Sequence, residues 1–263
     1  MNRLLALACA LSLASSLSAA TTTVESGNTL GFLRVEIGTS AEALIAIPWL
    51  GVATTDTDIK VTDVVKTANL TAGDQLFYYD TTSKKYQVWQ LNNSKEWVAA
   101  SIVSDDAGTK TAGETDKTLK RGNALLLKRT KTDETSVYLY GQVATSTDAI
   151  KTTMAQGTSE TLAYTLLAPP SVEDTDLNTG ATWANVNDGD WIVLSDSTVL
   201  TYRNDSDNTK KWCKVTGFDE TTNKDKIDTA VAKITAGQGA WYVSAKGATA
   251  TATVTWQAPA NKE

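Results

Sequence analysis

The sequence predicts an all-β protein built from two tandem homologous domains, each an antiparallel β-sandwich or a partly open barrel. Three observations predict this fold class. Short runs of residues alternate between apolar and polar side chains, as strands with one buried face do. Clusters of Asn, Asp, Gly, Ser and Lys separate these runs at spacings that suit hairpins. A set of motifs in the first part of the chain recurs in the second.

The first twenty residues have the pattern of a secretory signal peptide. Arg3 gives a positive start, residues 4–17 are apolar or small, and residues 18–20 place Ser, Ala and Ala at the cleavage positions. The apolar stretch is too short to anchor in a bilayer, and no later segment approaches the roughly 20 apolar residues that a membrane span needs. We therefore expect residues 1–20 to be removed and the mature chain to be secreted, either extracellular or at the cell surface.

The mature chain divides into an N-terminal segment with a first strand and two β-modules, at residues 21–40, 41–146 and 147–263. Alternating, β-branched or aromatic runs predict strands at residues 33–37, 86–91, 137–139, 190–194 and 252–256. One short helix is expected at residues 58–68, because Asp56 or Thr57 would cap it and apolar residues recur with helical spacing along it.

Self-comparison of the chain supports the two modules. Residues 72–78 resemble residues 188–194, each with a Gly-Asp pair ahead of a strand. Trp97 corresponds to Trp212, and from there one constant shift relates the two parts of the chain. Upstream the register slips, as loop insertions would cause, and Ile47-Pro48 is aligned with Ala168-Pro169. Each unit has about 110 residues, a typical domain size.

The order of these motifs also resembles a known module. A strand ending in Pro, a Gly-Asp strand, an aromatic hairpin closing on Trp, a Gly-x-Gly-x-Trp motif and a strand ending in Gln follow one another. This order is similar to a repeated β-module of secreted surface proteins from certain environmental bacteria, and the similarity extends from about Gly31 to Gln257. It is strongest at residues 236–241, whereas the first copy has Asn-Ala-Leu-Leu at residues 123–126. The resemblance implies secretion and a β fold with structural motifs.

Composition excludes several functions. The chain has no histidine, so Ser-His-Asp and Cys-His catalysis and imidazole metal sites are impossible. Its 24 Lys and Arg residues against 30 Asp and Glu residues give a net charge of −6, which argues against nucleic acid or anionic membrane partners. Basic residues are densest at residues 117–131, where intervening apolar residues favour an interpretation as solubility or edge protection.

Neighbouring acidic residues are the candidates for acid–base catalysis and for calcium binding. The pairs are Asp56 and Asp58, Asp105 and Asp106, Asp174 and Asp176, and Asp188 and Asp190. All lie in turn-like sequences, where Asp bonds nearby backbone, so we predict no catalytic residues and no enzyme. Residues 174–180 alternate oxygen-bearing side chains but lack EF-hand spacing. We expect no cofactor, with a shallow calcium site there or at residues 204–208 as the alternative.

The aromatic residues divide between core and candidate ligand surface. Trp97 and Trp212 occupy equivalent places and are expected in the two cores. The candidate residues for a platform that stacks a polysaccharide are four others: Trp49, Tyr79, Trp89 and Trp256. Trp89 aligns with Tyr202, and Trp256 with Gly141, so neither is required by the shared core. Core packing of these residues is the favoured interpretation, and the ligand platform is the alternative.

Cys213 is the single cysteine outside the predicted signal peptide, so it cannot form a disulfide within the mature chain. Its side chain either packs as a small apolar group or bridges two copies.

These features together favour a non-catalytic secreted structural protein, a self-assembling surface-layer or fibre subunit that forms a homo-oligomer or polymer. Residues 21–37 would pair with the open sheet edge of a neighbouring copy. The alternative function is a carbohydrate-binding or adhesive module. A hydrolase with two carboxylates is a third hypothesis, and it requires a deep acidic cleft between the units.

Overall fold

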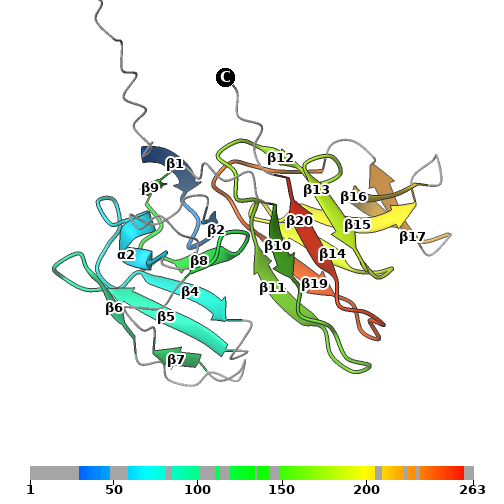
Figure 1. Cartoon of the computed structure of the whole chain (residues 1–263), viewed down its shortest axis with the longest axis horizontal. Coiled ribbons are helices and arrows are strands. Elements are labelled where there is room, and N and C mark those ends of the chain that lie inside the picture. The colour runs from blue at the N-terminus through cyan, green and yellow to red at the C-terminus, as the bar shows by residue number, and fades with distance from the viewer. Residues whose placement is uncertain are drawn as a thin grey trace, which may run out of the picture.

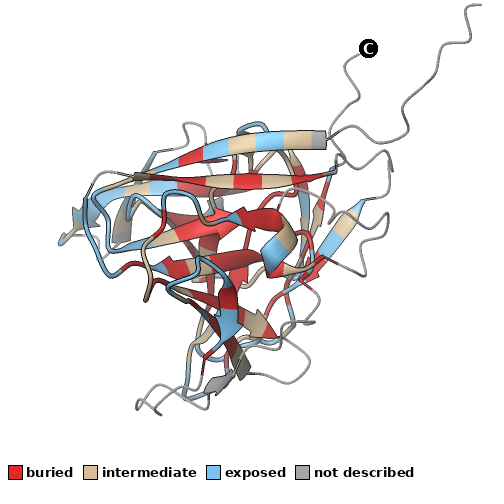
Figure 2. Cartoon of the chain, turned by 90° about the vertical axis from the view of Figure 1, so that its left-hand side faces the viewer, coloured by how far each residue is buried: buried red, intermediate tan, exposed pale blue. Residues whose placement is uncertain are grey.

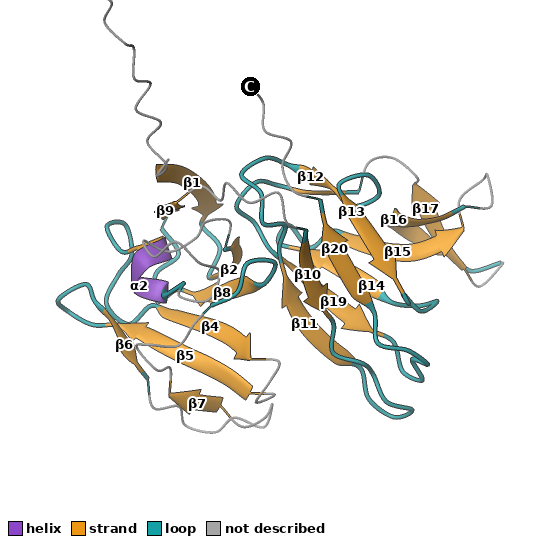
Figure 3. Cartoon of the chain, viewed as in Figure 1, coloured by secondary structure: helices purple, strands orange, loops and turns teal. Residues whose placement is uncertain are grey.

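The predicted all-β class is confirmed. The computed structural model describes residues 30–47, 59–80, 85–100, 110–112, 119–133, 135–142, 149–204, 209–221, 224–228 and 232–257. Within these ranges the chain is almost entirely strand, and the helix among them is the single turn α2 (Val61–Val64). The strands fall into two groups, residues 30–142 and 149–257, which we call the first half and the second half (Figures 1 and 3).

The first half contains two sheets whose named strands pair antiparallel, except that β7 joins β5 in parallel. The smaller sheet has the order β1-β9-β3, and the larger sheet has the order β2-β8-β4-β5-β6. The strands are β1 (Leu30–Gly38), β2 (Glu42–Ala46), β3 (Val65–Lys66), β4 (Gln75–Asp80), β5 (Lys85–Leu91), β6 (Trp97–Ala99), β7 (Lys110–Ala112), β8 (Ala124–Lys128) and β9 (Thr135–Gln142).

The hydrophobic core of the first half joins both sheets. Val35 and Leu139 from the smaller sheet belong to the same buried cluster as Leu76, Trp89 and Trp97 from the larger one. Figure 2 shows the buried residues gathered in the interior of this half, with exposed residues on its outer strands and turns. Removing apolar surface of this kind from water is the main favourable contribution to folding. The arrangement is a β-sandwich.

The second half contains a similar pair of sheets. Its smaller sheet has the order β10-β20-β13, and its larger sheet has the order β11-β19-β14-β15-β16-β17. A further two-stranded pair joins β12 and β18. The strands are β10 (Ile150–Thr153), β11 (Ala163–Leu167), β12 (Thr175–Asp176), β13 (Ala181–Ala184), β14 (Trp191–Leu194), β15 (Val199–Asn204), β16 (Lys210–Asp219), β17 (Lys224–Asp228), β18 (Lys233–Ile234), β19 (Ala240–Ser244) and β20 (Thr253–Trp256).

The strand registers correct two details of the sequence alignment. In the first half Leu76 pairs with Trp89, and in the second half Ile192 pairs with Leu200, so Trp89 corresponds to Leu200 and not to Tyr202. Tyr202 pairs with Trp212 as Leu91 pairs with Trp97, so the counterpart of Tyr202 is Leu91. The shift arises because the paired residues Tyr202 and Trp212 are ten positions apart, whereas Leu91 and Trp97 are six apart, so the second hairpin is longer.

The alignment near the first proline is also displaced by one residue. Ile45 pairs with Leu125, and Leu167 pairs with Ala240, which follows the constant shift from Leu125. Ala46 therefore corresponds to Ala168, and the earlier alignment of Ile47 with Ala168 is wrong.

Two predicted elements differ in extent from those observed. The helix expected at residues 58–68 has only the turn Val61–Val64, because Val65 and Lys66 pair with β9 as strand β3. Its N-cap is Lys60, whose side chain makes no capping hydrogen bond; Asp56 and Thr57 lie outside the described residues. The first strand, assigned to a separate segment at residues 21–40, pairs with β9 and so belongs to the first half.

The basic stretch does not protect a sheet edge. Its strand β8 lies between β2 and β4. Arg129 is buried, and its guanidinium donates to the carbonyl oxygens of Gly38 and Ser40, each at 3.1 Å, and to Asp133. The arginine therefore joins the β1–β2 turn to the end of β8.

The two halves meet through a reciprocal contact. Ala46 N–H donates to the Gly237 carbonyl at 2.8 Å, and Ala168 N–H donates to the Gly122 carbonyl at 3.1 Å. Gly122 and Gly237 are related by the constant shift, as Ala46 and Ala168 are related by the strand registers. A buried cluster that includes Leu44 and Leu166 surrounds these bonds. Each half thus supplies a turn carbonyl to a strand end of the other.

Among the described residues, no helix has the length and apolar character needed to cross a bilayer.

Candidate functional site

Two buried aspartates occupy equivalent places and serve as hydrogen-bond acceptors for the scaffold. Asp190 is fully buried and accepts the N–H groups of Asn187 and Ala245 at 2.8 Å each, as well as the hydroxyl of Tyr242. Asp74 likewise accepts the N–H groups of Thr71 and Thr130 at 2.8 Å each. Carboxylates bonded in this way join a strand start to a distant turn, and both are buried.

The acidic residues of the candidate calcium loop also bond to backbone. Asp174 accepts the Ala236 N–H at 3.0 Å, and Asp176 accepts the Asn178 N–H at 2.8 Å. The Asp176 bond is the local turn chemistry expected of Asp, whereas the Asp174 bond joins residues 62 positions apart. Within the described ranges, Cys, Asp and Glu side chains do not gather in groups of three or more that a metal ion could use. The other candidates lie outside the described residues: Asp56, Asp58, Asp105, Asp106 and residues 205–208.

Two members of the candidate ligand platform lie in the interior. Trp89 is 0% exposed and Trp256 is 1% exposed, and they belong to the cores of different halves. Trp256 donates its indole N–H to Thr152 at 3.2 Å, which fixes the ring inside. Tyr79 is half-buried against Tyr86, with ring centroids 5.1 Å apart. Trp49 lies outside the described residues. Core packing, the favoured interpretation, is confirmed for Trp89 and Trp256, and the alternative platform is contradicted there, because each points to the buried face of its strand.

A hollow that the sequence did not reveal opens on the second half. It has a volume of ≈ 480 Å³ and lies where β13, β15, β16 and the turn after β12 meet. We call it the Trp183–Tyr202 groove. Its lining comprises Asp176, Asn178, Thr179, Ala181, Thr182, Trp183, Tyr202, Thr209, Lys210 and Lys211.

An aromatic cluster forms the base of this groove. Trp183 and Tyr202 are half-buried, and their ring centroids lie 5.0 Å and 5.2 Å from that of the fully buried Trp212. Trp183 also stacks near-parallel to Tyr242, at 6.3 Å. The Trp183 indole N–H donates to the Leu177 carbonyl at 2.7 Å, so the ring has a fixed orientation.

The equivalent place in the first half is aliphatic. Trp183 pairs with Val254 as Val65 pairs with Leu139, so Val65 corresponds to Trp183, while Leu91 corresponds to Tyr202. Both Val65 and Leu91 are buried. The strand register identifies Val65 as the first-half residue that corresponds to Trp183.

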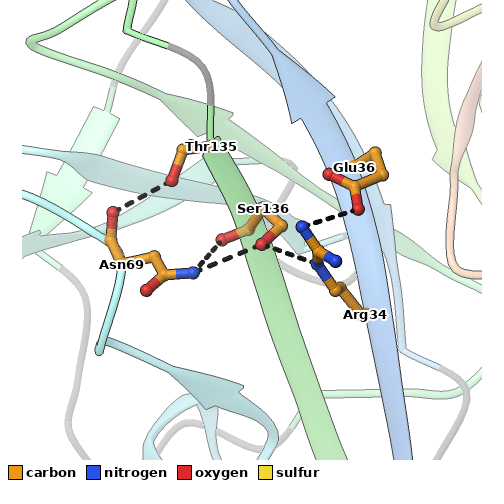
Figure 4. Close-up of a pocket in the computed structure, with 5 residues that line it drawn as sticks. All are labelled: Arg34, Glu36, Asn69, Thr135 and Ser136. Carbon is orange, nitrogen blue, oxygen red and sulfur yellow. Dashed lines mark hydrogen bonds and ion pairs between the residues drawn. The ribbon is translucent and has the colours of Figure 1, made fainter.

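The second hollow lies on the smaller sheet of the first half and is polar. It has a volume of ≈ 420 Å³ and is lined by Arg34, Glu36, Asn69, Thr135 and Ser136 (Figure 4). Arg34 pairs with Glu36 at 2.9 Å and donates to the Ser136 hydroxyl at 3.1 Å, and Asn69 donates to the same hydroxyl at 3.2 Å. Because these groups bond to one another, the hollow is electrically balanced.

Beside this hollow, three aromatic residues lie on the same sheet. Phe32 is 63% exposed and stacks on Tyr138, with ring centroids 5.2 Å apart and planes 22° apart. Lys66 lies over the Tyr140 ring, 4.9 Å from its centroid. Strand alternation places these residues on the face opposite Val35 and the core. We call Phe32, Tyr138, Tyr140 and Lys66 the outer aromatic face.

Two ionisable groups near the groove are perturbed for identifiable reasons. Burial raises the pKa of Tyr242 strongly, and its hydrogen bond to Asp190 and that carboxylate's charge add to the shift. The hydrogen bond from Lys210 to Asp188, at 2.8 Å, raises the pKa of the exposed lysine. Lys210 therefore stays cationic at the rim of the groove.

No protein-family model, curated protein or solved structure matches this chain.

Proposed function

We propose that the chain is a non-catalytic secreted structural protein that assembles with copies of itself through strand β1 and the outer aromatic face. The observation that carries the proposal is Phe32. Phe32 is 63% exposed on an end strand, stacks on Tyr138 and lies opposite Tyr140, and contiguous apolar patches at the surface commonly mark contacts with other molecules.

The position of β1 supports a contact between chains. β1 is the first strand in the order β1-β9-β3, so within the described residues only one of its edges has a strand partner. The unpaired N–H and C=O groups of such an edge can bond to a strand of another copy. Residues 30–37 already pair within their own half, so the added strand in this mechanism comes from residues 21–29.

We infer that the two halves are copies of one unit. The matched sheet orders and the paired positions Asp74 and Asp190 support this inference, as does the resemblance to a repeated module of secreted surface proteins. In the second half, threonines replace two members of the outer aromatic face, because Thr253 and Thr255 take the places of Tyr138 and Tyr140. Each chain would then have a single outer aromatic face, on its first half, so that copies would add with one orientation.

The test compares residues 21–263 with the variant Phe32→Lys by light scattering and negative-stain microscopy. The unsubstituted protein should form oligomers or fibres, and Phe32→Lys should remain monomeric because a charged side chain on an end strand opposes association. Val172→Lys is the matched control, since Val172 is also an exposed apolar residue but lies outside the strands. A monomeric unsubstituted protein, or unchanged assemblies in Phe32→Lys, would contradict the proposal.

A further inference from the structure

We infer that the Trp183–Tyr202 groove binds a saccharide ring, a role separate from the proposed assembly. The groove combines two half-buried aromatic side chains with hydroxyl, carboxylate and ammonium groups from Thr182, Asp176 and Lys211. Its volume of ≈ 480 Å³ lies in the range of small-ligand sites, about 300–1,000 Å³.

The chemistry of the lining fits a pyranose better than a purely apolar ligand. A pyranose has an apolar face of C–H groups and a rim of hydroxyl groups. Aromatic rings present a broad, partly negative face to such C–H groups. Side chains that both donate and accept hydrogen bonds, together with a lysine and a carboxylate, suit the rim of hydroxyls.

The residues of the groove are held in place before any ligand arrives. Trp183 is fixed by its bond to Leu177 and by packing on Trp212. The Asn178 side chain accepts the backbone N–H of Trp212 at 2.8 Å and donates to the backbone carbonyl of Trp212 at 3.0 Å. These bonds fix the turn beside the rings. A preorganised site loses less conformational entropy on binding, so more of the contact energy contributes to affinity.

The first half provides an internal comparison that points to function. There Trp97 donates its indole N–H to the Val65 carbonyl at 3.2 Å. The equivalent Trp212 is fully buried, and its indole N–H has no hydrogen-bond partner among the described residues. A buried donor without a partner lowers stability. The second half therefore leaves unpaired beside the groove a donor whose equivalent is paired in the first half, and such departures concentrate at functional sites.

The experiment measures binding of three soluble probes to residues 21–263 by calorimetry and tryptophan fluorescence. The probes are β-1,4-linked oligomers of glucose, of N-acetylglucosamine and of a uronic acid, so that neutral, acetamido and anionic sugars are each represented. At least one probe should bind saturably. Tyr202→Leu and Trp183→Val, which install the side chains of the first half, should each raise the dissociation constant about tenfold or more, equivalent to about 1.4 kcal/mol.

Trp191→Ala is the matched control, because Trp191 is 38% exposed on the second half but does not line the groove. This variant should bind like the unsubstituted protein, and near-ultraviolet circular dichroism should show that all variants fold. Tyr202→Leu keeps an apolar side chain where Leu91 stands in the first half, so it tests the inference even if Trp183→Val is unstable. The inference fails if none of the probes binds, or if both groove variants bind as well as the control. Saccharide binding can also be measured with Phe32→Lys added to each protein. A failure of binding is therefore distinct from a failure of assembly.

Discussion

Ala124 and Gly239 face each other at the contact between the two halves, and the constant shift of the repeat makes them equivalent residues. A Cβ on Gly239 would lie 2.4 Å from the Cβ of Ala124 and 3.2 Å from the carbonyl oxygen of Leu167. One methyl group fits between the halves at this point, and two do not. The contact therefore depends on a difference between two positions that are otherwise matched.

Gly239→Ala should consequently destabilise the chain by about 1–3 kcal/mol, the usual effect of overpacking a close contact. Urea denaturation followed by tryptophan fluorescence measures the change. Gly217→Ala is the control, because the nearest atom to its added Cβ is the Lys226 Cδ at 3.9 Å. Adding Ala124→Gly to Gly239→Ala should restore part of the loss. Equal stability of the two single glycine variants would show that the contact is not tight.

Asp190→Asn should lower the free energy of unfolding by about 2–3 kcal/mol, because a charged acceptor of buried N–H and O–H donors is lost. The amide group would direct N–H bonds at the donors of Asn187 or Tyr242. Asp188→Asn, two residues earlier, should have little effect because its ion pair with Lys210 lies on the surface. Denaturant titration at neutral pH compares the two, and similar midpoints would contradict a structural role for Asp190.

Stability should fall as the pH rises above about 10. Burial raises the pKa of Tyr86 to about 12, and burial also raises the pKa of Tyr78 and Tyr242. The unfolded tyrosines lose their protons first, so the unfolded state binds fewer protons than the folded state and is favoured. The contribution of Tyr86 is present below pH 10 and is lost by about pH 12.

Urea titrations between about pH 8 and pH 11 measure this dependence, with phenolate absorbance as the direct readout of ionisation. Tyr242→Phe should reduce the slope of stability against pH. An unchanged slope in this variant, or phenolate absorbance from all tyrosines in the native protein near pH 10, would contradict the assigned burial.

Cys213 should be unreactive in the folded protein. Its side chain is fully buried in β16, so a thiol reagent reaches it only after unfolding. Labelling with a chromogenic disulfide reagent, with and without denaturant, tests this prediction. A dimer on non-reducing electrophoresis would instead support the bridge between copies that the sequence left open.

The sequence was a good guide to strands and to the repeated buried positions. Alternation located β1 and β9, because each presents one face to a core and the other outward. Strand β5 was also located, although Val88 on its second face is buried in a separate cluster. Trp97 and Trp212 are buried at equivalent places, as expected. Local turn chemistry also explained Asp176, because its side chain bonds the backbone two residues later, whereas the bond of Asp174 to Ala236 spans 62 residues and depends on the fold.

Features that depend on register and on distant contacts were not predictable in the same way. A tryptophan in a strand can face either side, and the longer hairpin before Trp212 displaced the alignment of Trp89, so the ligand platform was misplaced. Val65 is in a strand and not in the expected helix, because it pairs with Leu139 of β9. The groove at Trp183 and the contact at Gly239 join segments that are far apart in sequence, and no local pattern specifies which segments meet.

The hydrogen bonds from Ala168 N–H to the Gly122 carbonyl and from Ala46 N–H to the Gly237 carbonyl bear on how the protein matures. Neither half can complete its own backbone bonding while the other is absent. The second half, which is synthesised last, thus supplies the carbonyl that the Ala46 N–H of the first half needs. A chain truncated during translation would leave that strand end exposed and without its hydrogen-bond partner.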